Sequence, residues 1–432
     1  MNTLKKILNT STDTAVANFN PIDGSTTSQN TTNDSNNNVG RPSTSPINFK
    51  TMPFKINKGN VETVKDNKPR IDLNVEEETQ SYHINDKDLP PYLCQPHNDL
   101  IEKFRYIQKQ EDLRLRDATI HPETSKWKLG CSADISNNKR NRYANIMTYE
   151  RNRVKLNVID GNDYINASYV KVNIPEQSER AGLYIATQGP TLATYNQFWQ
   201  MCFDKCPGKD IVIVMVTPLT EGYREKCYPY WPSQEGEEWH IPQKQSTKQG
   251  DFSEFKYGLD IKCLSVFTPS AASHNLPFTY TKMNLTISNQ PPSNRHTKTI
   301  HHIYFDKWRD MSSPDEFEPI LELSKFANGL NIQNNPIVVH CSAGVGRTGT
   351  FIALDHLVNF TKDFDVDLPD FVRDYTHDLI EQIVSQLRIQ RLKMVQLLDQ
   401  YTFIYNAARE IYIKHVLQES RKRYRRIREE NN

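Results

Sequence analysis

The sequence predicts an α/β fold: one twisted, mixed β-sheet flanked by helices. Several short apolar runs in the first two thirds of the chain are bounded by turn residues, as is typical of strands. These runs are 211–216, 255–264 and 299–305. From Phe317 onward the apolar spacing becomes mainly helical, interrupted by one short strand-like run at 336–340. Strands and helices that alternate in this way form a sheet covered by helices.

Composition divides the chain into three parts. Residues 1–90 are dominated by Asn, Thr, Ser, Asp and Lys without a sustained apolar pattern, so we expect a disordered tail. A single folded domain is expected over 91–415, followed by a basic extension at 416–432. The domain should open with a helix whose apolar residues have helical spacing: Leu100, Phe104, Ile107, Leu113 and Leu115. Two polar stretches inside the domain, 243–250 and 269–275, are predicted surface loops.

Charge and cysteine content exclude several classes of function. The formal net charge is +1, so no global field favours nucleic acid, and we expect no nucleic-acid partner. The seven cysteines lack metal-ligand spacing, which argues against a disulfide framework or a metal site, and no cofactor is expected. The longest apolar run is 211–216, far below the roughly 18 residues that a membrane span needs. These features favour a reducing, cytoplasmic environment.

The most informative segment is the run from Ile337 to Thr350, which has the pattern of a strand, a tight glycine-containing loop and a helix. A loop that opens a helix directs unpaired backbone N–H groups to one point, and the helix dipole adds positive potential there. The amides of Ser342, Ala343, Gly344, Val345 and Gly346 should therefore bind an anion, and the guanidinium fork of Arg347 can hold two phosphate oxygens.

A cysteine at such a helix N-terminus, close to an arginine, is a thiolate at neutral pH, so Cys341 is the candidate nucleophile. Thr348 can donate a hydrogen bond to its sulfur when the sulfur must leave. Cys-x5-Arg alone is expected roughly 0.4 times by chance, but requiring Gly344 and Gly346 lowers that to about 0.002. The alternative is a buried cysteine that merely ends a strand.

These residues resemble the cysteine-dependent, tyrosine-specific protein phosphatases, in particular small yeast-type intracellular members. The family signature matches residues 340–349, read as His-Cys-Ser-Ala-Gly-Val-Gly-Arg-Thr-Gly. Further motifs follow in family order: Asn141-Arg142-Tyr143, Asp163 to Ser168, Thr187 to Pro190, Phe198-Trp199, Lys226-Cys227 with Tyr230-Trp231-Pro232, and Gln396 with Gln400-Tyr401. The resemblance implies hydrolysis of phosphotyrosine in proteins through a phosphocysteine intermediate.

The resemblance also implies roles for individual residues. Tyr143 would stack on the phosphotyrosine ring in a slot too deep for phosphoserine, and Asn145 would bind the substrate backbone. Glu221 would fix Arg347, with Lys226 close by. Gln396 and Gln400 would orient the attacking water. Simpler alternatives are an ordinary half-buried aromatic residue for Tyr143 and solvated loop charges for Glu221 and Lys226. For Gln396 and Gln400 the alternative is helix capping or a surface position.

The loop expected to carry the general acid departs from the family pattern, because Trp308-Arg309-Asp310 stands where the family has Trp-Pro-Asp. Asp310 keeps the family spacing and would protonate the leaving tyrosine oxygen. Loss of the proline puts loop closure in doubt. Asp306 and Asp315 are nearby alternatives for the acid.

We therefore expect a monomeric enzyme of intracellular signalling whose partners are tyrosine-phosphorylated proteins. Two alternatives remain: a phosphotyrosine-binding pseudophosphatase, suggested by Arg309, and a scaffold whose function lies outside the domain. The basic extension could bind an acidic surface or an import receptor, which would add a nuclear location, or it could be a solvated helix end.

Overall fold

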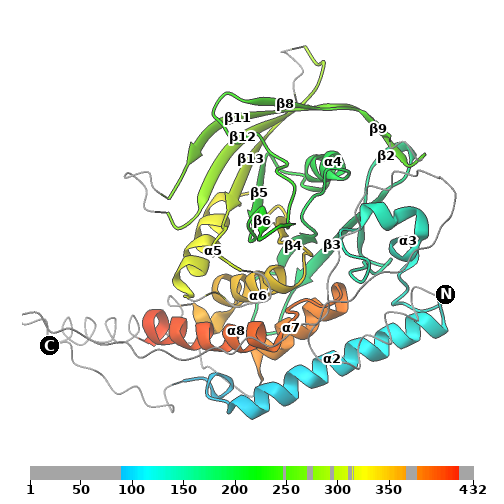
Figure 1. The fold of residues 1–432 in the computed structure, drawn as a ribbon. Coiled ribbons are helices and arrows are strands. Elements are labelled where there is room, and N and C mark those ends of the chain that lie inside the picture. The colour runs from blue at the N-terminus through cyan, green and yellow to red at the C-terminus, as the bar shows by residue number, and fades with distance from the viewer. Residues whose placement is uncertain are drawn as a thin grey trace, which may run out of the picture. The chain divides into compact units, whose positions relative to one another are not determined.

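The computed structural model describes residues 89–246, 250–269, 276–291, 296–309, 314, 316–365 and 377–417 (Figure 1). The predicted tail, except for its last two residues, lies outside this range. So do the candidate acids Asp310 and Asp315, the predicted loop from residue 270 to 275, and the basic extension beyond Leu417. Among the described helices, none combines the length and apolar character needed to cross a membrane.

A nine-stranded mixed sheet forms the centre of the domain, as the sequence predicted. The strands follow the order β1 (Arg153–Lys155), β3 (Tyr164–Val172), β4 (Gly182–Thr187), β14 (Ile337–His340), β5 (Asp210–Met215), β13 (Thr297–Tyr304), β12 (Thr279–Ile287), β11 (Leu259–Phe267) and β8 (Glu238–Ile241). Strands β4, β14, β5 and β13 run parallel, and the outer pairs are antiparallel. The parallel strands β5 and β14 are rich in Ile and Val because both of their faces are covered.

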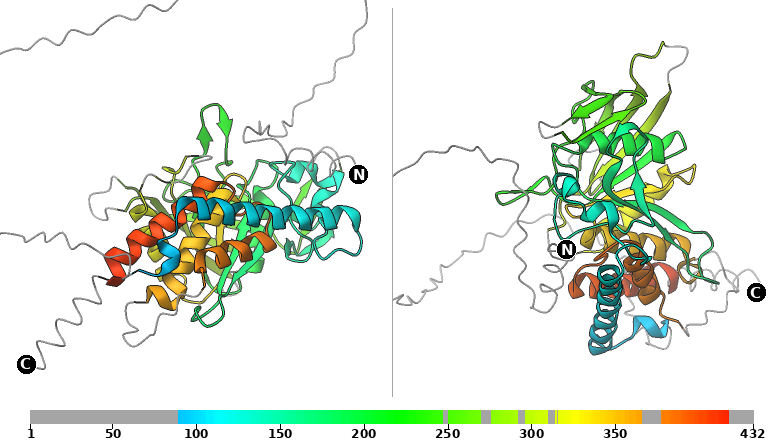
Figure 2. Two further views of the ribbon diagram at one scale, coloured as in Figure 1. Left: turned by 90° about the horizontal axis from the view of Figure 1, so that it is seen from below. Right: turned by 90° about the vertical axis from the view of Figure 1, so that its right-hand side faces the viewer.

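Alternate residues of β5 point into two different hydrophobic cores. Ile211 and Ile213 pack with α4 (Tyr195–Lys205), whereas Val212 and Val214 pack with the helices of the opposite face. Those helices are α5 (Glu318–Leu330), α6 (Gly346–Phe360), α7 (Leu379–Gln390), α8 (Leu398–Ile411) and α2 (His97–Ile120). Figure 1 shows α4 and α5 on opposite sides of the sheet, and Figure 2 (left) shows α2 crossing in front of α7 and α8.

Helix α2 confirms the predicted opening helix with one correction. Leu100, Phe104, Ile107 and Leu115 are buried against the domain, but Leu113 is 47% exposed. Leu113 lies two residues before Leu115, and two residues turn an α-helix by about 200°, so the two side chains occupy opposite faces. The apolar spacing that predicted the helix is therefore correct, but Leu113 does not belong to its buried stripe.

Two further corrections concern the strands. The predicted loop at 243–250 contains β9 (Lys244–Ser246), which pairs with β10 (Phe252–Phe255) and so joins β2 (Val158–Gly161) in a small sheet. Backbone pairing and a Lys244–Glu254 contact of 3.2 Å hold this polar strand, which carries no apolar alternation. The predicted strand 255–264 is divided, because Phe255 ends β10 and β11 begins at Leu259.

The remaining elements are short. A two-stranded hairpin consists of β6 (Thr220–Glu221) and β7 (Arg224–Glu225). The short helical segments are η2 (Pro91–Leu93), α3 (Gly130–Ala133), η3 (Ile135–Arg140), η5 (Lys362–Phe364) and η6 (Tyr412–Leu417). Of these elements, the β6–β7 hairpin contributes to the site described below.

A buried carboxylate fixes α6, the helix that follows the predicted anion loop. Asp355 accepts hydrogen bonds from Tyr184 Oη on β4 and from Ser324 Oγ and Asn328 Nδ2 on α5, each at 2.7 Å. Burial raises the pKa of Asp355 to about 6. Because this folded-state pKa lies above the unfolded value, the group's contribution to stability is full at low pH and is lost as the pH rises through about 6.

We predict that Asp355→Asn lowers the free energy of unfolding by about 1–3 kcal/mol, because its amide N–H groups would face donors. The deficit should be larger near pH 4.5 than at pH 7, since the wild-type contribution falls over that interval. Urea unfolding at both pH values measures this. Asp399→Asn, at an exposed position on α8, is the control. A deficit that grows with pH would contradict the assigned direction.

Candidate active site

The predicted anion loop joins the end of β14, at His340, to the start of α6, at Gly346. We call residues 341–347 the phosphate loop. Cys341 is buried at its base, and Gly344 N–H donates to the Cys341 sulfur at 3.2 Å. Gly344 has φ +71°, and a Cβ there would lie 2.0 Å from the carbonyl oxygen of Thr187. Only glycine fits this turn.

Four consecutive carbonyl groups of the phosphate loop are each held by a donor outside the concave side. The bonds are His340 Nδ1 to Cys341 O (3.1 Å), Gly189 N to Ser342 O (2.8 Å), Arg391 Nη2 to Ala343 O (3.2 Å) and Arg391 Nε to Gly344 O (2.8 Å). In a trans peptide unit the N–H points opposite to the C=O. Fixing the four carbonyls therefore turns the N–H groups of residues 342–345 toward the sulfur, as the Gly344 bond shows directly.

Arg391, which the sequence analysis missed, connects this loop to the sheet. Its guanidinium is fully buried and also donates to Asn166 Oδ1 (2.8 Å) and Ser168 Oγ (3.2 Å) on β3. Burial lowers the pKa of Arg391 to about 10. The sequence held one weak signal, an arginine between Ile389-Gln390 and Leu392 in the part of the chain with helical apolar spacing. Its distance of 50 residues from Cys341 gave no reason to link the two.

Arg347 is held at two points. The side chain is 2% exposed, and its Nη1 donates to Glu221 Oε1 (3.0 Å) and to the carbonyl oxygen of Trp308 (2.8 Å). The other oxygen of Glu221 lies 3.4 Å from Lys226 Nζ. The hairpin residue Glu221 thus lies between Arg347 and Lys226, and Arg347 also anchors the backbone two residues before Asp310, which is outside the described residues.

Tyr143 stands beside the phosphate loop with its hydroxyl fixed. Its Oη lies 2.8 Å from Ser342 Oγ, and Ser342 Oγ donates at 2.8 Å to the carbonyl oxygen of Lys226. Because a carbonyl only accepts, the one proton of Ser342 goes there, so Tyr143 donates to Ser342. The ring is 8% exposed. Asn145 lies two residues further along the same loop and is half-buried.

The polar residues near the start of α6 and α8 have distinct environments. Thr348 Oγ1 is buried and has no hydrogen-bond partner among the described residues. Gln400 Oε1 accepts from the backbone N–H of Gln396 (3.1 Å) and of Leu397 (3.3 Å), so Gln400 does cap α8. It also lies against the phosphate loop, since a Cβ on Gly346 would be 2.9 Å from Gln400 Oε1. Gln396 is half-buried just before α8.

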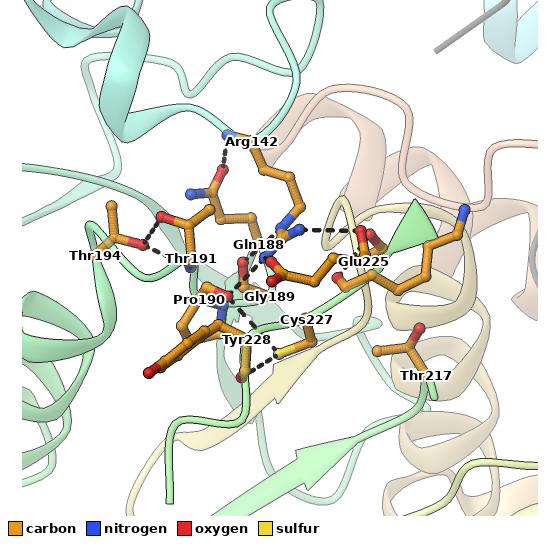
Figure 3. A network of polar contacts seen from close by, with 12 residues as sticks. Arg142, Gln188, Gly189, Pro190, Thr191, Thr194, Thr217, Glu225, Cys227 and Tyr228 are labelled. Carbon is orange, nitrogen blue, oxygen red and sulfur yellow. Dashed lines mark hydrogen bonds and ion pairs between the residues drawn. The ribbon is translucent and has the colours of Figure 1, made fainter. Parts of the chain in front are cut away.

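A second arginine that the sequence analysis left without a role, Arg142, supports the loop from the other side (Figure 3). It donates to the carbonyl oxygens of Gly189 (3.0 Å) and Pro190 (2.6 Å) and pairs with Glu225 (3.1 Å). Its own N–H donates to Gln188 Oε1 at 2.8 Å. Arg142 therefore fixes the segment whose Gly189 N–H holds the phosphate loop.

The chemistry that the described side chains offer at this site is nucleophilic. Within those parts of the chain, no group of three or more His, Cys, Asp or Glu could hold a metal ion. The arrangement offers one sulfur at the focus of several amide N–H groups beside a fixed guanidinium. Such a site binds a tetrahedral oxyanion and places it against the sulfur.

Comparison with known proteins agrees with this chemistry. The sequence model of the protein-tyrosine phosphatase family matches residues 137–410. Tyrosine-protein phosphatase 1 of Saccharomyces cerevisiae is 52% identical over 330 residues, which are 74% of this chain and 96% of that protein. Tyrosine-protein phosphatase 1 of Schizosaccharomyces pombe is 33% identical over 309 residues, 71% of this chain and 50% of that protein.

The fold is shared with a solved chain from a study of the PTPN18 fingerprint on distinct HER2 tyrosine phosphorylation sites. The TM-score is 0.56 at 22% identity, covering 73% of this chain and 95% of that chain. The family match spans more than half of the sequence and includes every described residue of the phosphate loop. This chain belongs to the protein-tyrosine phosphatase family.

Proposed function

We propose that this protein hydrolyses phosphotyrosine in proteins through a phosphocysteine intermediate on Cys341. The observation that carries the proposal is the position of the Cys341 sulfur. It receives the Gly344 N–H at 3.2 Å, and the carbonyls of residues 341–344 are held by donors on the outside of the loop. The surrounding N–H groups stabilise a thiolate and then the phosphoryl oxygens. The pseudophosphatase alternative is not favoured, because the chain's relatives are tyrosine-protein phosphatases.

In the first step the Cys341 thiolate attacks phosphorus, forming the S–P bond while the P–O bond to tyrosine breaks. The loop amides and Arg347 neutralise the phosphoryl oxygens. The contacts of Arg347 with Glu221 and Trp308 support this role, because they fix the plane of the guanidinium before substrate arrives. Asp310 would supply the proton to the departing tyrosine oxygen. The hydrogen bond from Arg347 to the carbonyl oxygen of Trp308, two residues earlier in the chain, supports this assignment.

In the second step water attacks the phosphocysteine, the S–P bond breaks and inorganic phosphate leaves. Gln396 and Gln400 orient the water, while Asp310 accepts its proton. Thr348 donates to the departing sulfur. Its buried hydroxyl supports that assignment, since it has no other partner among the described residues. Every bond in the cycle is made and broken by these side chains and water.

Substrate selection rests on Tyr143 and its neighbours. The bond between Tyr143 and Ser342 holds the ring against the phosphate loop, so the ring forms one wall of the approach to Cys341. An aromatic wall pairs with the phosphotyrosine ring. Asn145, on the same loop, would bind the substrate backbone, and Lys226 would stay near the acid loop through Glu221.

The proposed domain, 91–415, is wider than the family match. Helix α2 precedes that match, yet the Phe104 ring lies 5.4 Å from that of Tyr401 and Glu111 pairs with Arg388 at 3.3 Å. These contacts support including α2 in the folded unit. We further propose a monomeric, cytoplasmic enzyme of cell signalling. The basic segment 416–432 would add nuclear import or contact with an acidic surface.

We predict that Cys341→Ser abolishes release of phosphate from a phosphotyrosine peptide while peptide binding persists, because a hydroxyl fits the loop but is a far weaker nucleophile. Phosphate release and calorimetric binding are the measurements. Cys263→Ser, a buried cysteine on β11, is the control and should keep its activity. Turnover by Cys341→Ser would refute the nucleophile assignment.

We predict that Asp310→Ala lowers kcat on a phosphotyrosine peptide by roughly 10²- to 10⁴-fold, the usual contribution of general acid catalysis. An aryl phosphate with an activated leaving group should be affected much less, because that group leaves without a proton. Asp306→Ala is the matched control. If Asp306→Ala reproduces the loss and Asp310→Ala stays active, the acid is misassigned.

We predict that Arg391→Lys lowers kcat/KM by roughly 10- to 100-fold, because an ammonium cannot bridge two loop carbonyls and β3 as the planar fork does. The peptide assay measures this, and thermal unfolding monitors the fold. Arg116→Lys on the exposed side of α2 should match the wild type. A folded Arg391→Lys enzyme with full activity would show that the loop keeps its shape without this bridge.

A further inference from the structure

Three buried side chains form a continuous hydrogen-bond chain that ends on the backbone of Cys341. His302, on β13, lies with its Nε2 2.8 Å from Tyr230 Oη. The same hydroxyl is 2.7 Å from His340 Nε2, and His340 Nδ1 is 3.1 Å from the carbonyl oxygen of Cys341. All three side chains are fully buried. His302 has no part in the mechanism above.

The direction of every proton in this chain is set at its Cys341 end. The carbonyl can only accept, so His340 carries its proton on Nδ1 and leaves Nε2 bare. Tyr230 must then donate to His340, and its oxygen accepts from His302 Nε2–H. A neutral imidazole has one N–H, so His302 Nδ1 is bare. That atom is buried without a hydrogen-bond partner among the described residues, as this assignment requires.

The chain stays uncharged because its surroundings disfavour an imidazolium. Burial is the main cause that lowers the pKa of His340 to about 4, with Arg142 adding to it, and burial also places the pKa of His302 well below its usual value. The titratable or charged side chains that act on the chain from neighbouring elements are Arg142, Cys202 and Cys227. The ring of Trp231 covers His302 at 4.4 Å.

We propose that His302 is a positioning residue for the phosphate loop: through Tyr230 and His340 it keeps the carbonyl of Cys341 turned outward, and so keeps the Ser342 N–H turned toward the sulfur and the phosphate. The inference extends the proposed function, since it concerns how the same loop is held. Successive hydrogen bonds polarise one another, so the His302 donor strengthens the two bonds that follow it.

The unpartnered nitrogen of His302 supports this role. A buried acceptor without a donor costs stability, and an apolar side chain in this aromatic pocket would avoid the cost. The Nε2–H is the only polar contact that the imidazole makes among the described residues, and that contact leads to Cys341. The contribution of His302 beyond packing is therefore its single hydrogen bond.

The test measures the rate at which iodoacetate alkylates Cys341 as a function of pH. Mass spectrometry of the peptide that contains Cys341 quantifies the alkylation. We expect His302→Leu and Tyr230→Phe to raise the pH midpoint of alkylation by roughly 0.3–1 unit, the equivalent of one hydrogen bond, because a loosened loop stabilises the thiolate less. His302→Gln, whose amide can donate to Tyr230, should restore the wild-type midpoint. The double variant should shift no further than either single one.

A matched control shares strand β13. Tyr280 Oη, on β12, is 2.8 Å from Nδ1 of His301 on β13, a second tyrosine–histidine pair that does not lead to the phosphate loop. Tyr280→Phe should leave the alkylation midpoint unchanged. A folded His302→Leu protein with the wild-type midpoint would reduce His302 to a packing residue and overturn the proposal, as would a His302→Gln protein shifted as far as His302→Leu.

Two features keep the outcome decisive. If His302→Leu does not fold, an unchanged midpoint in Tyr230→Phe overturns the proposal by itself, because that change removes the same link and keeps the ring. Alkylation also requires no turnover, so a failure of the positioning role is distinguishable from a failure of the proposed reaction, which Cys341→Ser tests separately.

Discussion

The outward anchoring of the phosphate-loop carbonyls is the constraint on which the rest of this site depends. A loop that curls around a sulfur could present either its N–H or its C=O groups, and only the N–H groups attract an anion. Four peptide units of the loop are turned the required way by three donor groups. An imidazole and a backbone amide each hold one carbonyl, and a guanidinium holds two. The binding site for phosphate is therefore formed before phosphate arrives, which removes reorganisation from the reaction.

These anchors come from distant parts of the chain and lock several elements together. Arg391 follows α7 and reaches β3, Gly189 follows β4, and Arg142 holds Gly189 in place while its neighbour Tyr143 reaches Ser342. A Cβ on Gly189 would lie 2.7 Å from the Cys341 carbonyl oxygen, so the close approach itself requires glycine. Buried arginines suit this task because their planar, always charged groups satisfy several carbonyls at once.

Local pattern was enough to predict the features that depend on neighbouring residues. The mixed sheet, the opening helix and the strand–loop–helix around Cys341 follow from apolar spacing and glycine positions, since backbone geometry there is set within a few residues. Strand β9 escaped prediction because backbone pairing holds its polar residues, and Leu113 was misassigned because only packing shows which face is buried. Arg391, Arg142 and His302 could not be linked to Cys341, because they lie 39 to 199 residues from it in the sequence. Contacts between residues so far apart do not affect the local sequence pattern.

Thr348 Oγ1 and His302 Nδ1 are both buried without a hydrogen-bond partner in the described parts of the chain, but they are not equivalent. Thr348 Oγ1 lies in the first turn of α6, close in sequence to Arg347, where a sulfur that leaves phosphorus would offer an acceptor during the reaction. His302 Nδ1 lies at the far end of the Tyr230–His340 chain, among aromatic rings, where no reacting group arrives. In the proposed mechanism the first atom would donate to that transient acceptor. The second is the unavoidable end of a chain whose proton direction is fixed by the Cys341 carbonyl, and its cost to stability is permanent. Both atoms therefore lower the stability of the fold, and each is explained by the site: one by the orientation of the Cys341 peptide unit and the other by the proposed departure of the sulfur.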